Sequence, residues 1–117
     1  GAKMPKVFHV NWFKKGTQGE YLWPGFGDNM RVLEWVLGRV DGNAAAVESP
    51  LGYQPTVDAL NTAGLAINSE QLQELLAVDK ADWVEELQSQ AEFLGSIGEK
   101  LPSEMLAQYE DLKKRLG

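Results

Sequence analysis

The chain has 117 residues, a formal net charge of −6 at pH 7 and no cysteine. Its hydrophobic content of 44% and charged content of 24% are typical of a soluble globular domain, or of a piece of a larger one. The absence of cysteine excludes a disulfide framework and a thiolate metal site, and the acidic balance argues against binding to a nucleic-acid backbone. No run of about 18 apolar residues and no signal-like N-terminus is present, so we expect a cytoplasmic protein that is neither membrane-inserted nor secreted.

Charge is distributed unevenly along the chain. Residues 1–15 contain lysines and no acidic residue, whereas residues 70–92 are strongly acidic. The lysines are Lys3, Lys6, Lys14 and Lys15, and the acidic residues are Glu70, Glu74, Asp79, Asp82, Glu85, Glu86 and Glu92. The basic end coincides with a cluster of aromatic residues, which would suit an anionic ligand. Solvated lysines that flank a strand explain the same pattern equally well.

The first predicted elements form a hairpin. Residues 7–13 alternate with period two, which predicts a strand with Phe8, Val10 and Trp12 on its core face. Residues 14–19 contain two glycines and predict a turn. Residues 20–23 predict a second, antiparallel strand that ends at Pro24.

A glycine-flanked ring and a helix follow the predicted hairpin. Gly25 and Gly27 allow positive φ on either side of Phe26, so the loop can present that ring outward. Asp28 is a suitable N-cap for a helix that runs to about Val40. Apolar residues cover more than half of its circumference, so we expect it to be buried on several sides. That burial is demanding for a chain of this length, and it indicates a missing neighbour.

Residues 43–67 show little periodicity and predict an irregular connection. Asn68 and Gln71 stand at capping-box spacing and begin a helix that runs to about Val78. Asp79 caps a longer helix that runs to about Gly95. Pro102 begins the last helix at a first-turn position. The apolar stripes of the last two helices are Trp83, Val84, Leu87, Ala91 and Leu94, and then Met105, Tyr109, Leu112 and Leu116.

No catalytic or metal-binding set emerges from the residues. His9 is the only histidine, and its strand neighbours offer only Asn11 as a further ligand, so a structural role is favoured. The adjacent acids Glu85/Glu86 and Glu110/Asp111 fall on solvent-facing helix positions, which lack the cleft that acid–base catalysis needs. Neither a GxxxxGK[ST] phosphate loop nor a GxGxxG fingerprint is present.

The aromatic cluster of residues 8–26 has two interpretations. The rings can form the core of a small hairpin-plus-helix unit. Alternatively, some of them stack on a planar base, which is worth about 1–3 kcal/mol per base but does not select among bases. Selection needs hydrogen bonds at the base edge, and Asn29 with the backbone N–H groups at the helix start could donate to the O6 acceptor of guanine. Asn29 alone discriminates poorly, because a flipped amide accepts from adenine instead.

At these residues the chain resembles GTP-dependent phosphoenolpyruvate carboxykinase. The resemblance is carried by FHVNWF at 8–13, YLWPGFGDN at 21–29 and RVLEWVLGRVDG at 31–42. It continues through SPLGYQP, DALN, ELLAVDKADW and the last helix, so it covers essentially the whole chain.

The resemblance implies a guanine-binding set. Phe13, Tyr21 and Phe26 match the rings that line the guanine slot, Asn29 matches the residue that contacts the base edge, and Phe26, Gly27, Asp28 and Asn29 form the nucleotide-contact loop. Tyr21 departs from the phenylalanine common in the family, and the turn at 14–20 is less charged than in many members. Phe8, Val10, Trp12 and Trp23 remain with the core.

The resemblance also implies the fold and the role. We expect an α+β fragment of a larger α/β enzyme, with a short β-hairpin followed by a buried helix and about three further helices. Its parts are 1–42 with the hairpin, guanine loop and helix, 43–67 as an irregular connection, and 68–117 as a helical segment.

The parent enzyme would convert oxaloacetate and GTP to phosphoenolpyruvate, GDP and CO2 in gluconeogenesis, using Mn²⁺ or Mg²⁺ held by residues outside this chain. The fragment would bind guanine nucleotide, hold no catalytic or metal-ligating residue, and be inactive alone. We expect a monomeric parent and a fragment able to self-associate. The alternative is a stand-alone interaction domain whose acidic helices bind a protein partner.

Overall fold

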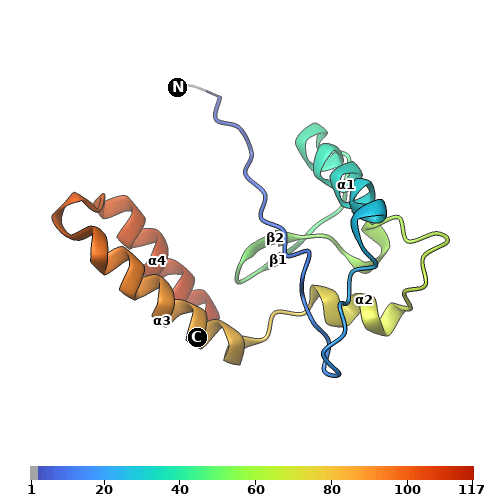
Figure 1. Cartoon of the computed structure of the whole chain (residues 1–117). Helices are drawn as coiled ribbons and strands as arrows, with labels where there is room; N and C mark the ends of the chain where they lie inside the picture. The colour runs from blue at the N-terminus through green and yellow to red at the C-terminus, as the bar shows by residue number, and fades with distance from the viewer. Residues whose placement is uncertain (1–2) are drawn as a thin grey trace. The chain divides into compact units, whose positions relative to one another are not determined.

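A computed structural model describes residues 3–117 (Figure 1). The helices are α1 (Asn29–Asp41), α2 (Ser69–Leu76), α3 (Lys80–Ile97) and α4 (Ser103–Leu116), and the strands are β1 (Val47–Ser49) and β2 (Gly52–Gln54). Single 3₁₀ turns occupy Phe26–Asp28, Val57–Ala59 and Gly98–Lys100. The expected fold class, an α+β fragment with one short hairpin and several helices, is confirmed.

The chain divides into two compact units. The first contains the residues up to Val47 together with Tyr53–Ala77, and the second contains Glu48–Gly52 and Val78–Gly117. Within residues 3–117, no helix has both the length and the apolar character needed to cross a membrane.

The hairpin lies at β1 and β2, and the strands predicted at 7–13 and 20–23 are wrong. Around the predicted turn the structure contains only an isolated antiparallel bridge between Lys15 and Tyr21. The backbone N–H of Phe13 donates to Oδ1 of Asn11 at 3.0 Å, a local bond that replaces a ladder bond. The chain reversal itself forms, because the N–H of Leu22 donates to the carbonyl of Lys14 at 3.0 Å.

The β1–β2 hairpin falls inside the stretch predicted to be irregular. Its turn is closed by the Ser49 hydroxyl, which donates to the Gly52 carbonyl at 2.9 Å and accepts from the Leu51 N–H at 3.2 Å. Gly52 has φ 122°, a conformation that favours glycine. Strands of three residues are too short to show a period of two in the sequence.

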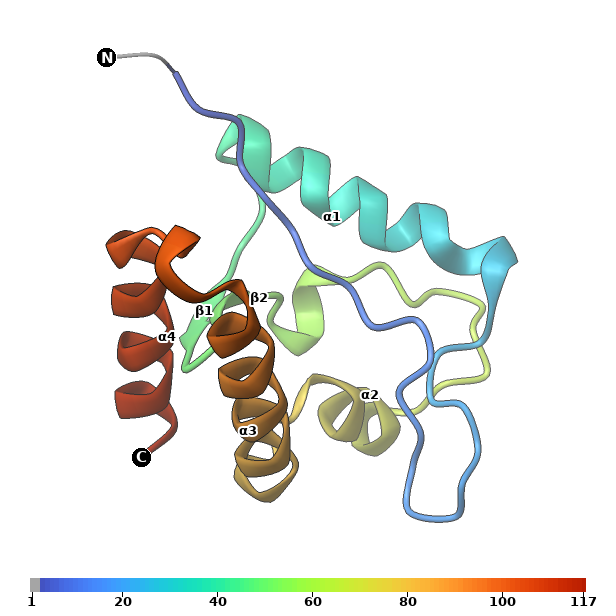
Figure 2. The same cartoon turned by 60° about the vertical axis from the view of Figure 1, so that its left-hand side comes forward.

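The core of the first unit forms around Trp35 of α1, Leu60 and Leu72 of α2. Phe8 packs edge-on against Trp35 with ring centroids 6.0 Å apart, and Figure 2 shows the N-terminal segment running beside α1. The Trp35 indole N–H donates to the carbonyl of Ala45 at 2.9 Å, so its polar atom is satisfied on burial.

The prediction that α1 is buried on several sides is wrong for this chain. Trp35 is its only buried residue, while Leu33, Leu37 and Val40 are exposed. The core of the first unit covers one face of α1, and the apolar residues of the other faces contact solvent. This exposed surface agrees with the expectation that the helix lacks a neighbour here.

Two lysines of the basic N-terminal segment cap helix C-termini. The Lys14 ammonium donates to the carbonyls of Glu74, Leu75 and Ala77 at 2.9, 3.1 and 2.6 Å, at the end of α2. The Lys6 ammonium donates to the carbonyls of Arg39 and Val40 at 2.5 and 3.2 Å, at the end of α1. A cation at this end satisfies orphan carbonyls and complements the helix dipole. These two lysines therefore have a structural role at the ends of α1 and α2.

Two of the helix starts predicted downstream are confirmed, those capped by Asn68 and Asp79. Asn68 Oδ1 accepts from the Gln71 N–H at 2.8 Å while the Gln71 side chain accepts from the Asn68 N–H at 3.0 Å, which is a complete capping box. Asp79 caps α3 by accepting from the Ala81 N–H at 2.8 Å. Pro102 stands at the N-cap of α4, so the helix begins at Ser103 and Pro102 is not the first-turn residue that was predicted.

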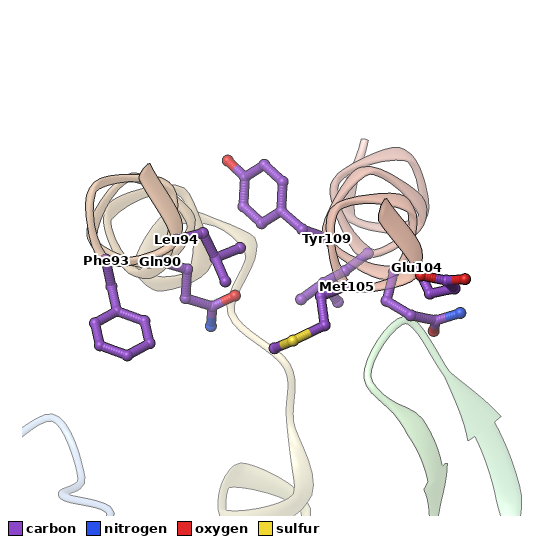
Figure 3. Close-up of a pocket in the computed structure, with 8 residues that line it drawn as sticks. Gln90, Phe93, Leu94, Glu104, Met105 and Tyr109 are labelled. Carbon is purple, nitrogen blue, oxygen red and sulfur yellow. The ribbon is translucent and has the colours of Figure 1, made fainter. Parts of the chain in front are cut away.

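In the second unit, α3 and α4 form a helical hairpin. The Tyr109 hydroxyl donates to the Leu87 carbonyl at 3.2 Å, and Leu116 is buried. Val84 and Ala91 are exposed, so they do not belong to the apolar stripe as predicted. An open hollow of about 520 Å³ lies between the two helices, with Leu94, Met105 and Tyr109 among its lining residues (Figure 3).

Candidate functional site

The chain reversal at residues 14–22 presents two of the predicted site rings. Phe13 and Tyr21 lie edge to face with ring centroids 6.1 Å apart and planes at 68°. Both remain outside the core, with exposed fractions of 72% and 60%, and the Lys15 ammonium lies 5.6 Å from the Tyr21 centroid. Large exposed rings that pack on one another rather than on the core mark a surface able to take a planar ligand.

Phe26 projects from the turn that begins α1. Its ring is 92% exposed, as expected for a glycine-flanked loop. Gly25 provides the required backbone, with φ 134°, whereas Gly27 does not have positive φ. In the described part of the chain no aromatic ring is paired with Phe26, so the structure brings Phe13 and Tyr21 together but does not pack Phe26 onto them.

Asp28 acts differently from the predicted N-cap. It occupies the N-cap position of α1, but its side chain makes no capping hydrogen bond. Instead its carboxylate accepts from Nε of Arg31 at 3.1 Å, and Nη1 of Arg31 donates to the Asn61 carbonyl at 2.8 Å. This chain of contacts ties the start of α1 to the connection that follows the hairpin.

Asn29, the first residue of α1, is held by a tryptophan. The Trp23 indole N–H donates to Oδ1 of Asn29 at 2.9 Å. Trp23 is only 5% exposed, and its ring lies 6.3 Å from that of Trp12. Sequence reasoning placed Trp23 in the core, which is confirmed, but missed its polar contact with Asn29. The sequence feature that could have indicated this contact is the spacing of six residues between Trp23, whose indole N–H is a donor, and Asn29, whose amide begins the helix.

Some residues of the aromatic cluster belong to the core, and others are exposed. Trp23 is buried, and Phe8 and Trp12 are partly buried, so these three belong to the core as predicted. Val10 is exposed, and its predicted core position is wrong. Phe13, Tyr21 and Phe26 are exposed and do not serve the core.

The other candidate groups form no second site. His9 is exposed, and so are Glu85, Glu86, Glu110 and Asp111, as predicted for a solvated helix face. Within residues 3–117, no group of three or more His, Cys, Asp or Glu side chains converges in a way that could hold a metal ion.

Comparison with known proteins finds one family over nearly the whole chain. The profile described as "Phosphoenolpyruvate carboxykinase C-terminal P-loop domain" matches residues 1–115. Among curated proteins, "Phosphoenolpyruvate carboxykinase [GTP]" of Renibacterium salmoninarum is 47% identical over 98% of this chain. Proteins of the same name from Paenarthrobacter aurescens and Thermoplasma volcanium are 42% and 45% identical over 98% and 97% of this chain.

The chain spans 19% of the length of these relatives. Its sequence contains no GxxxxGK[ST] pattern of a phosphate-binding loop. The match nevertheless covers both of its structural units. The chain therefore belongs to the family of phosphoenolpyruvate carboxykinase C-terminal P-loop domains.

Proposed function

We propose that this chain is the guanine-recognising part of a GTP-dependent phosphoenolpyruvate carboxykinase. One observation carries the proposal: the exposed rings of Phe13, Tyr21 and Phe26 occur in the same segment as Asn29, an ordered amide at the start of α1. The family membership and the names of the relatives support the choice of guanine nucleotide as the ligand.

In the proposed site, the aromatic rings stack on the base and Asn29 distinguishes guanine from other bases. An exposed ring that stacks on a base contributes about 1–3 kcal/mol without regard to base identity. Asn29, with the backbone N–H groups at the start of α1, reads the base edge. Gly27 and Asp28 complete the loop, with Asp28 fixing the helix start through Arg31.

The proposal assigns the chemistry to a longer protein that contains this chain. That protein would convert oxaloacetate and GTP to phosphoenolpyruvate, GDP and CO2 in the cytoplasm, with Mn²⁺ or Mg²⁺ neutralising the phosphates. The described residues do not fit a metal site, and the sequence contains no GxxxxGK[ST] phosphate-loop pattern. Base recognition and orientation are thus the contribution of this chain, and it is expected to be inactive alone.

A chimera tests this assignment at the level of activity. Residues 1–115 of this chain replace the matched segment of the Renibacterium salmoninarum relative, which supplies the remainder of the enzyme. We expect the chimera to form phosphoenolpyruvate from oxaloacetate with GTP and to use ATP far less well. The unmodified relative serves as the control for expression and metal content.

A folded, metal-loaded chimera that uses ATP as well as GTP would refute the assignment of base recognition to this chain. The alternative of a stand-alone interaction domain with acidic helices gains no support from the comparisons.

A further inference from the structure

The contact between Trp23 and Asn29 has a definite polarity. An indole N–H can only donate, so the atom that faces it must be the amide oxygen of Asn29. The NH2 group of Asn29 is therefore turned away from Trp23. In the described part of the chain no protein acceptor binds that NH2 group, and it is not a buried atom without a partner.

Both partners of this contact are held in place. Trp23 is buried, and its ring packs against that of Trp12. Asn29 has helical backbone angles of φ −60° and ψ −28°. If the amide flipped, its NH2 group would face the indole N–H, two donors would meet, and the indole would lose its acceptor. The flipped state is therefore disfavoured.

We propose that Trp23 is a positioning residue for base selection. It fixes the Asn29 amide with the donor outward, so that Asn29 can donate to the keto oxygen at C6 of guanine but cannot accept from the amino group at C6 of adenine. This inference rests on the proposed function, because it assumes that a purine base meets Asn29. An asparagine whose amide can rotate freely discriminates poorly, because it can donate to guanine or accept from adenine. The hydrogen bond from Trp23 removes this ambiguity.

The variants separate this orientation effect from packing. Trp23→Phe keeps a ring in the core and removes the indole N–H, which is the one donor to Asn29 Oδ1 among residues 3–117. Trp12→Phe is the matched control, because it makes the same chemical change in the neighbouring ring and leaves the Trp23–Asn29 hydrogen bond intact. Asn29→Asp keeps an acceptor for the indole but provides no donor to the base.

The measurement is the affinity of the full 117-residue chain for GDP and for ADP. We expect Trp23→Phe to tighten ADP binding and to reduce the GDP-over-ADP preference about fivefold or more. Trp12→Phe should keep the wild-type preference. Asn29→Asp should weaken GDP binding about fivefold or more without weakening ADP binding. A purely structural role for Trp23 would instead weaken both nucleotides equally, and that result, or an unchanged preference, overturns the proposal.

Hydrogen exchange in the nucleotide-free chain distinguishes failure of the proposed guanine recognition from failure of the proposed role of Trp23. The indole proton of Trp23 should be protected from solvent exchange, and Asn29→Ala should speed that exchange while Asn29→Asp should not. A wild-type chain without any GDP preference refutes both the proposed function and its dependent inference, even where this protection is observed. A GDP preference without this protection refutes the orientation by Trp23 alone.

Discussion

Replacing Phe26 with alanine is expected to weaken GDP binding about 5- to 150-fold without changing the free energy of unfolding. The ring is 92% exposed and pairs with no other described ring, so its removal costs the fold nothing that the structure shows. The loss corresponds to the stacking of one base on one aromatic face, about 1–3 kcal/mol. Quenching of tryptophan fluorescence on titration with GDP measures the affinity.

The control for this variant is Phe93→Ala. Phe93 has a similar chemical nature and is also exposed, but it lies on α3 in the second unit. It should leave GDP binding unchanged. Equal affinities for wild type and Phe26→Ala would remove Phe26 from the site.

Replacing Trp35 with alanine is expected to lower the free energy of unfolding by about 3–5 kcal/mol. Trp35 is a central residue of the small core of the first unit. Its loss removes the edge-to-face contact with Phe8 and leaves the carbonyl of Ala45 without its indole donor. A core of this size has few other contacts that could compensate, so we expect the first unit to unfold.

Chemical denaturation followed by circular dichroism measures this change. Leu37→Ala on the same helix is the matched control, because Leu37 is exposed and its replacement should change the stability by less than about 0.5 kcal/mol. A loss of less than about 1 kcal/mol for Trp35→Ala would contradict the described core.

The helices were predictable wherever their signals are local. Asn68 and Gln71 form the capping box that their spacing predicts, and Asp79 caps α3. These bonds join residues two or three positions apart, so the sequence contains both partners.

The predicted strands failed because a strand depends on a partner elsewhere. The alternation of side chains at residues 7–13 indicates that one set faces the core and the other faces solvent. It does not specify which other segment would supply the hydrogen bonds of a strand. In the structure Lys6 and Phe8 contact α1 through their side chains instead, and Asn11 bonds locally to the Phe13 N–H. The β1–β2 hairpin is fixed by the turn at Ser49–Gly52, a signal too short to register as periodicity.

The candidate site was predictable in its residue types but not in its internal contacts. Phe13, Tyr21, Phe26 and Asn29 stood out as rings and an amide beside glycines. The geometry that orders the amide depends on Trp23, whose burial and donor direction require coordinates. The helix-capping roles of Lys6 and Lys14 were likewise not predictable, because the carbonyls that accept from them lie far away in the sequence, at the ends of α1 and α2.

Amide-resolved NMR of the chain titrated with GDP tests guanine recognition most directly. We expect chemical-shift changes that cluster at Phe13, Tyr21 and Phe26–Asn29 and are larger for GDP than for ADP, while the residues that line the α3–α4 hollow do not shift. Shifts concentrated in that hollow, or an equal response to GDP and ADP, would contradict the claim that this chain recognises guanine.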